Sequence, residues 1–212
     1  LSLAVIIQDD LTANINLQLR DIADFIRGLP KGSRVMVGYI RGGSVQTTQK
    51  FTDDLEKAAK SLRIVSGSAG SGGNGPYGGL IDVVKKFEAL PSGRRAVLLV
   101  SDGVDTSQGT SVGSLIQTID LDNSITRAQR NSVAVYTFYS PTILTQGGNA
   151  ALIGGGQGAL LKLSNETGGR SFFQGNIAPV SFTPFFRDLN LLLGRQFALT
   201  YLSTHMKKGY HT

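Results

Sequence analysis

The chain of 212 residues is long enough for one large domain or two small ones, and its 41% hydrophobic and 17% charged residues allow a sizeable core. It contains no cysteine, which excludes disulfides, thiol nucleophiles and thiolate metal sites. The formal net charge of +6 comes from basic residues that are scattered, apart from short pairs such as Lys85-Lys86 and Arg94-Arg95. The sequence therefore predicts a generally basic surface and no nucleic-acid site.

The first element is an apolar run, residues 3–7, that stops at the two carboxylates Asp9 and Asp10. A short apolar run bounded by polar residues is typical of a strand that is buried on both faces. Apolar residues at spacings of three and four then predict a helix with Asn14 as its N-cap. These residues are Ile15, Leu19, Ile22, Ile26 and Leu29.

A second strand is predicted over residues 34–40, and Gly42-Gly43 joins it to a polar, alternating strand over 44–51. A Gly-Gly link between two strand-like runs indicates a hairpin, so the alternating strand belongs at a sheet edge. A short helix over 52–61 follows. Residues 66–79 are rich in glycine and serine and predict a loop, since no Gly-Lys-Ser/Thr ends them as a phosphate cradle requires.

The rest of the chain alternates between helical and strand patterns. A helix over 80–90 precedes a second apolar strand, 95–102, that ends at Asp102. The elements expected after it are helices around 111–119 and 125–130, a strand over 132–140, a glycine-rich loop over 147–158, a helix over 159–167, a short strand over 171–174, a helix over 185–193 and a strand over 196–203.

This order predicts one α/β domain that spans residues 1–212. Its Rossmann-like architecture has three layers: a mostly parallel central sheet with one antiparallel edge strand, and helices on both faces. No apolar run approaches the roughly 20 residues that span a membrane, so we expect no membrane insertion. No signal peptide is visible, and residue 1 opens almost directly into a strand, so we expect an excised part of a longer chain.

Two strands of the predicted sheet end in carboxylates. If these strands are neighbours, Asp9, Asp10 and Asp102 converge on the crevice where open α/β sheets place their ligands. Carboxylates, hydroxyls and water are the ligands of Mg²⁺, Mn²⁺ and Ca²⁺. The same acids can instead cap helices and bind backbone N–H groups without any metal.

At this point the chain resembles the von Willebrand factor A-type (VWA) domain. The resemblance rests on the apolar strand that ends in Asp, the Gly-Gly hairpin, the segment VLLVSDG that contains Asp102, and the segment TGGRSF that ends at Phe172. It looks most like VWA-related domains of bacteria. The resemblance implies the VWA fold, a protein or other macromolecule as partner, and an exported or cell-envelope location.

The resemblance also implies a metal-ion-dependent adhesion site, which uses Asp-x-Ser-x-Ser, a Thr before the third helix and a later Asp. Asp102 matches the last position. A motif that starts at Asp9 puts Leu11 and Ala13 at the serine positions, whereas one that starts at Asp10 puts Thr12 and Asn14 there. The Thr position falls near Gly78. The sequence therefore predicts a degenerate site that binds Mg²⁺, Mn²⁺ or Ca²⁺ weakly through Asp9, Asp10 and Asp102, or not at all.

Catalysis has few candidate residues. Both histidines, His205 and His211, lie in the tail, which excludes a Ser-His-Asp arrangement in the core. We therefore predict a binding module and no enzyme. Its candidate ligand-binding residues are Asp9, Asp10, Thr12, Tyr77 and Asp102, and Tyr77 and Tyr139 are expected to be exposed as interface anchors. The alternative is a domain that depends on a divalent metal, for adhesion or for hydrolysis.

Overall fold

The fold is built on one six-stranded sheet. The computed structural model describes residues 1–65, 67, 75–107, 119–175, 177 and 179–194. The strand order is β3-β2-β1-β4-β5-β6, and only the pairing of β3 with β2 is antiparallel. The strands are β1 Ser2–Gln8, β2 Arg34–Arg41, β3 Ser44–Thr52, β4 Arg95–Ser101, β5 Val133–Tyr139 and β6 Ser171–Phe172. The predicted fold class and the antiparallel edge strand are therefore confirmed.

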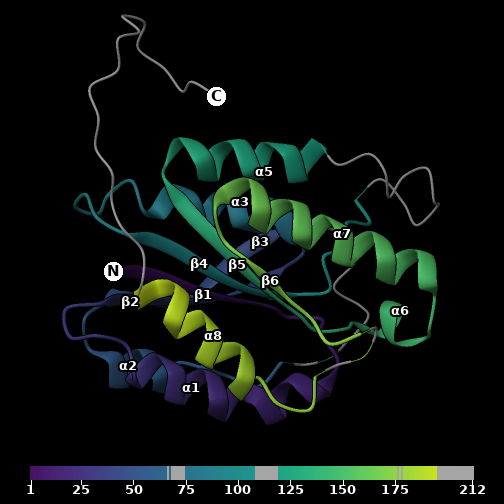
Figure 1. The fold of residues 1–212 in the computed structure, drawn as a ribbon, viewed down its shortest axis with the longest axis horizontal. Helices are drawn as coiled ribbons and strands as arrows, with labels where there is room; N and C mark the ends of the chain where they lie inside the picture. Colours follow the sequence, from purple (N-terminus) through teal and green to yellow (C-terminus); the bar gives the residue numbers. More distant parts are fainter. Residues whose placement is uncertain (66, 68–74, 108–118, 176, 178, 195–212) are drawn as a thin grey trace, which may run out of the picture.

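Helices cover both faces of the sheet (Figure 1). One face carries α1 (Leu19–Arg27), α2 (Leu55–Lys60) and α8 (Thr183–Gly194), and the other carries α3 (Pro76–Lys86), α5 (Ile119–Arg130) and α7 (Ala150–Thr167). The side chains of β1 alternate between the two cores: Leu3, Val5 and Ile7 join the first, and Ala4 and Ile6 the second. Burial on both faces explains why this strand is continuously apolar.

Phenylalanines fill the core beneath α8. The ring of Phe138 on β5 lies between 5.0 and 5.3 Å from four others: Phe172, Phe182, Phe185 and Phe186. Such edge-on and tilted contacts add to the stabilisation that burial itself gives. Phe173, which follows the last residue of β6, is 39% exposed and lies outside this core.

Residues 147–158 form no glycine-rich loop, and that prediction is wrong. The four-residue helix α6 (Ile143–Gln146) precedes them, and α7 starts at Ala150 with Asn149 as its N-cap. Glycine is needed at one position of α7 for packing: a Cβ on Gly156 would lie 2.2 Å from the carbonyl oxygen of Asp102. Tertiary packing here overrides the low helix propensity of glycine.

The first helical segment also differs from its prediction. The chain enters a 3-10 helix, η1 (Ala13–Gln18), and becomes α-helical only at Leu19, so Asn14 is not the N-cap. The predicted helix over 125–130 is the second half of α5. The predictions for 111–118 and 196–203, and for most of the 66–79 loop, fall outside the described residues.

Candidate functional site

The carboxyl ends of β1 and β4 lie side by side, as predicted. The two strands pair in parallel from Ser2↔Arg95 to Ile7↔Val100. Gln8, the last residue of β1, ties them together, because its Oε1 accepts hydrogen bonds from Ser101 Oγ at 2.5 Å and from the Asp102 amide at 3.3 Å. This junction is where a doubly wound sheet places its ligand site.

Asp102 is buried, with 1% of its surface exposed. Its Oδ1 accepts from the Val104 amide at 3.0 Å and its Oδ2 from Thr142 Oγ1 at 2.7 Å. The pKa of Asp102 is raised to about 6, mainly by burial and also by the nearby charge of Asp10, against the opposing effect of its hydrogen bonds. The negative charge at this position is therefore poorly compensated by the protein itself.

Asp10 is half-buried and lies in the same electrostatic environment. Burial is the main cause that raises the pKa of Asp10, and the neighbouring Asp9 adds to it, while a hydrogen bond with Gln8 lowers it. Asp10 and Asp102 thus form a pair of like charges. Such a pair favours a positively charged or proton-donating ligand between or beside them.

Thr12 supplies a hydroxyl without a partner. Its Oγ1 is buried and has no hydrogen bond among the described residues. Its amide donates to the Pro141 carbonyl at 3.0 Å, and Leu11 forms a β-bridge with Thr142, so the loops after β1 and β5 lie together. An unsatisfied buried hydroxyl costs about 1–3 kcal/mol, which a ligand oxygen, a water or a cation at this place would offset.

Asp9 does not join this group, which corrects the prediction that all three acids converge. Its carboxylate accepts two hydrogen bonds from the Arg63 guanidinium, at 2.7 and 3.1 Å. Arg63 also lies over the ring of Tyr39, 4.0 Å from its centre. In the described part of the chain, no three Asp, Glu or His side chains are grouped so that they could hold a metal. Asp9 serves to fix the 61–65 segment on the sheet.

The strand β1 ends at Gln8, and Asp9 and Asp10 form a turn after it. Gln8 and Asp10 both interact with Asp102, whereas Asp9 binds Arg63. The residues that interact with Asp102 therefore include Gln8, which lies before both motif registers considered from the sequence. Sequence reasoning missed Gln8 because it assigned the strand end to the first acid. It also missed Thr142, which no motif marks.

The oxygen donors at this junction fit a hard divalent cation in type but not in number. Two carboxylates, Asp10 and Asp102, and the Thr12 hydroxyl are donors that Mg²⁺, Mn²⁺ or Ca²⁺ accepts. Gln8 Oε1 already accepts two hydrogen bonds. Gly78, near which the sequence placed the threonine of the VWA motif, has no room for a larger side chain, since a Cβ there would lie 2.9 Å from the Gly43 carbonyl oxygen.

Tyr77 and Tyr139 are buried, with 1% and 0% of their surface exposed, so the expectation of two exposed aromatic anchors is wrong. Tyr77 is the second residue of α3 and turns inward, where its hydroxyl donates to the Gly103 carbonyl at 2.7 Å. This bond fixes the loop after β4, which carries Asp102. Tyr77 therefore holds the loop that carries Asp102 in place, while its own side chain is not exposed to a ligand.

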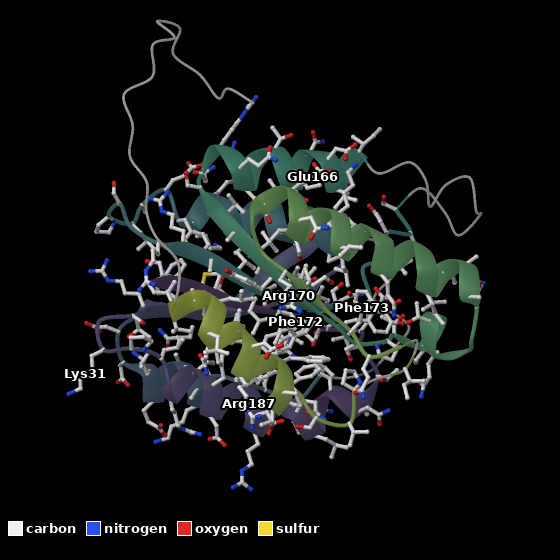
Figure 2. All side chains as sticks on the ribbon, viewed as in Figure 1. Lys31, Glu166, Arg170, Phe172, Phe173 and Arg187 are labelled. Atoms are coloured by element: carbon white, nitrogen blue, oxygen red, sulfur yellow. The ribbon has the colours of Figure 1, made fainter. Side chains whose placement is uncertain are left out.

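Exposed apolar side chains gather at the same end of the sheet. They follow β1, β5 and β6, or lie on the 61–65 segment that packs on η1 through hydrogen bonds between Val65 and Asn16. We call this set the apolar rim: Leu17, Ile64, Ile143, Leu144, Phe173, Ile177 and Val180. Figure 2 labels Phe173 at this end. The other large exposed apolar residues among those described lie on α5, α7 and α8: Ile119, Leu161 and Leu191.

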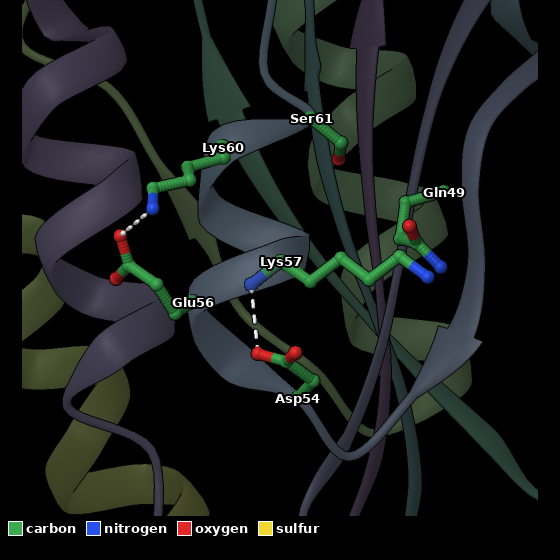
Figure 3. Close-up of a pocket in the computed structure, with 6 residues that line it drawn as sticks. All are labelled: Gln49, Asp54, Glu56, Lys57, Lys60 and Ser61. Atoms are coloured by element: carbon green, nitrogen blue, oxygen red, sulfur yellow. Dashed lines mark hydrogen bonds and ion pairs between the residues drawn. The ribbon is translucent and has the colours of Figure 1, made fainter.

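A pocket of about 440 Å³ lies elsewhere, between the edge strand β3 and α2 (Figure 3). Its polar groups are used locally: Asp54 accepts from the Lys57 amide at 2.9 Å, and Glu56 pairs with Lys60 at 3.3 Å. The carboxylates of Asp54 and Glu56 are thus engaged by neighbours, whereas the Lys57 ammonium makes no ion pair with a described residue. None of the described helices is long and apolar enough to cross a membrane.

A doubly wound sheet with its site at the carboxyl ends of β1 and β4 defines a Rossmann-like domain. No family model and no curated protein sequence matches the chain. Among solved structures it is similar to an aerotolerance-related membrane protein from Bacteroides fragilis, with a TM-score of 0.60 and 12% identity over 92% of this chain and 100% of that one.

Two further solved structures name the fold. The vWF domain of the type V pili tip protein Mfa5 from Porphyromonas gingivalis has a TM-score of 0.59 and 12% identity over 94% of this chain and 97% of that one. A von Willebrand factor type A protein from Catenulispora acidiphila has a TM-score of 0.59 and 14% identity over 89% of this chain and 41% of that one. The chain therefore has the VWA fold.

Proposed function

We propose that this chain is a non-catalytic, adhesion-type module that binds a protein with the loops at the carboxyl end of its sheet. The observation that carries the proposal is the apolar rim, which surrounds the junction of Asp10, Thr12 and Asp102. Contiguous exposed apolar residues with a polar centre are typical of protein interaction sites.

Contacts between loops bring several parts of the rim together. Gln18 donates to the Val180 carbonyl at 2.9 Å, which brings the 179–182 segment beside η1 and therefore near Leu17. The bridge between Leu11 and Thr142 brings α6, with Ile143 and Leu144, beside the start of the same 3-10 helix. The rim is thus assembled by segments that are more than 120 residues apart.

The solved structures named above support the adhesion-type assignment and an exported or cell-envelope location. One is the vWF domain of a pilus tip protein, and another is an aerotolerance-related membrane protein. We infer that residues 1–212 act as one such domain.

The test compares variants of the rim with variants of equally exposed residues elsewhere. Leu17→Ser, Leu144→Ser and Val180→Ser remove apolar surface at the rim, and Leu161→Ser and Leu191→Ser remove it from α7 and α8. Each purified variant is used to capture proteins from the envelope and secreted fractions of the source organism. We expect a partner that wild type, Leu161→Ser and Leu191→Ser retain and that the three rim variants lose. Equal retention by all five variants would contradict the proposal.

The second candidate is a metal-dependent form of the same domain, and it is favoured by the unpartnered Thr12 hydroxyl and by the like charges of Asp10 and Asp102. Thermal unfolding in EDTA and then in millimolar Mg²⁺, Mn²⁺ or Ca²⁺ separates the two. We propose a degenerate site, which shifts stability by less than about 1 kcal/mol. A site of micromolar affinity adds about 4 kcal/mol, and that gain is lost in Thr12→Val and Asp102→Asn.

A further inference from the structure

At the opposite end of the sheet, where β4 and β5 begin, the structure contains a basic pocket of about 310 Å³. It opens between the turn before β4 and the turn after α5. Its lining residues are Ser92, Gly93, Arg95, Arg130, Asn131 and Ser132. Two of the six carry a positive charge and none carries a negative one, so the pocket has a net positive charge of its own.

Among the described residues, the charge of Arg95 is compensated only by the dipoles of backbone carbonyls. Its Nη1 donates to the Asn131 carbonyl at 3.2 Å and its Nη2 to the Leu90 carbonyl at 3.1 Å, just past the carboxyl ends of α5 and α3. Its Nε is buried and has no partner among the described residues. Carbonyl dipoles position the guanidinium but leave most of its charge uncompensated.

Other arginines add to the positive electrostatic potential at this pocket. Arg130, the last residue of α5, is exposed and makes no ion pair with a described residue. Arg94 donates to the Leu193 carbonyl at 2.8 Å, and Arg34 opens β2 at the same end of the sheet. The carboxylate of Glu88 does not offset them, because it pairs with Arg127 at 3.0 Å.

The walls of the pocket supply neutral donors as well. Ser92 and Ser132 bring hydroxyls that bond to no described residue. Ser132 adopts the left-handed conformation, with φ at 52°, in the tight turn that connects α5 to β5. Guanidinium groups together with hydroxyls are the donors that proteins use for tetrahedral oxyanions.

We propose that this pocket binds a phosphate group, with Arg130 and Arg95 as its cationic residues and the serine hydroxyls as additional donors. Free phosphate and the phosphate headgroup of an anionic lipid share this chemistry. The site lies at the amino ends of the strands, away from the apolar rim. It therefore does not depend on the function proposed for the other end.

Inorganic phosphate is the first probe, added at constant ionic strength so that general screening of charge stays fixed. We expect saturable shifts of the backbone amide resonances of Gly93, Asn131 and Ser132. Arg130→Gln should weaken this binding about tenfold, because one charge-assisted contact is lost, and Arg130→Lys should weaken it less. Arg187→Gln is the matched control: Arg187 is exposed on α8 (Figure 2), which lies on the opposite face of the sheet from α5.

Vesicles distinguish the source of the phosphate. If phosphatidylglycerol vesicles bind, phosphatidylcholine vesicles do not, and inorganic phosphate competes, the ligand is a lipid headgroup. Saturable binding of inorganic phosphate alone supports a soluble phosphate ligand. Shifts that do not saturate, equal weakening by Arg130→Gln and Arg187→Gln, or vesicle binding that phosphate does not compete for would each overturn the proposal.

Discussion

The two ends of one sheet differ in the sign and the compensation of their charges. The carboxyl end holds two acids, Asp10 and Asp102, whose pKa values are raised mainly by burial, within an apolar rim. The amino end holds arginines that bond to backbone carbonyls and to no described acid. The net charge of +6 therefore conceals a separation of charge along the strands. Each end is suited to a ligand that the other end repels.

The largest effect is expected from Gly156→Ala, which breaks the carboxyl end and leaves the amino end intact. The new Cβ would lie 2.2 Å from the Asp102 carbonyl oxygen, so α7 must move away from the site loop. We expect a loss of about 3 kcal/mol in the free energy of unfolding, measured by denaturant titration.

Gly154→Ala is the control, because nothing lies within 4 Å of its Cβ. It should stabilise α7 by about 0.5–1 kcal/mol, as alanine does in an exposed helix position. Equal destabilisation by both changes would show that α7 does not lie against Asp102 as the structure has it.

Arg63→Ala tests the ion pair that holds the 61–65 segment against the carboxyl end of β1. It leaves the Asp9 carboxylate, 2% exposed, without its ion pair and removes the contact with the Tyr39 ring. Because Arg63 is itself 37% exposed, we expect a loss of about 2–3 kcal/mol, below the upper values for fully buried pairs.

Arg20→Ala is the matched control for Arg63→Ala. Its partner Asp24 lies 3.9 Å away and Arg20 is 91% exposed, so the loss should stay below about 0.5 kcal/mol. A loss for Arg63→Ala as small as this would mean that the pair with Asp9 does not form in solution.

Asp102 should make stability depend on pH at the carboxyl end. Its pKa is about 6 in the folded state and 3.8 as its ordinary value, so the folded state binds the proton more tightly. Stability from this group is therefore present below pH 4 and is lost as pH rises through 6, by at most about 3 kcal/mol. Asp102→Asn in EDTA should abolish this loss, whereas Asp53→Asn, on the exposed start of the α2 segment, should leave it unchanged. If the stability of Asp102→Asn depends on pH as steeply as that of wild type, Asp102 is not the group responsible.

The smallest effect is expected at the amino end. Arg130 is exposed and makes no ion pair with a described residue, so Arg130→Gln should change the free energy of unfolding by less than about 0.5 kcal/mol. Denaturant titration in the absence of phosphate measures this. A larger loss would mean that Arg130 stabilises the fold, and the contrast between the two ends would then be smaller than the structure indicates.

Much of the fold could be predicted from local patterns. Apolar runs over 3–7 and 95–102 indicated buried strands, and Gly42-Gly43 indicated the antiparallel edge. The neighbouring carboxyl ends of β1 and β4 followed from the rule for doubly wound sheets. The glycines of α7 led to a wrong prediction of a loop, and the one that packing requires, Gly156, contacts Asp102, 54 positions away.

The sequence by itself determined which segments are strands and helices, and that acids follow two of the strands, because hydrophobic periodicity and turn residues act over a few positions. Only the tertiary structure decided what each acid does. Asp9 and Asp10 are adjacent in the chain, yet the turn that they form after β1 places Asp9 against Arg63 and Asp10 near Asp102. The same holds for Tyr77, whose burial depends on where α3 packs. Burial and partners come from distant segments, and local composition does not encode them.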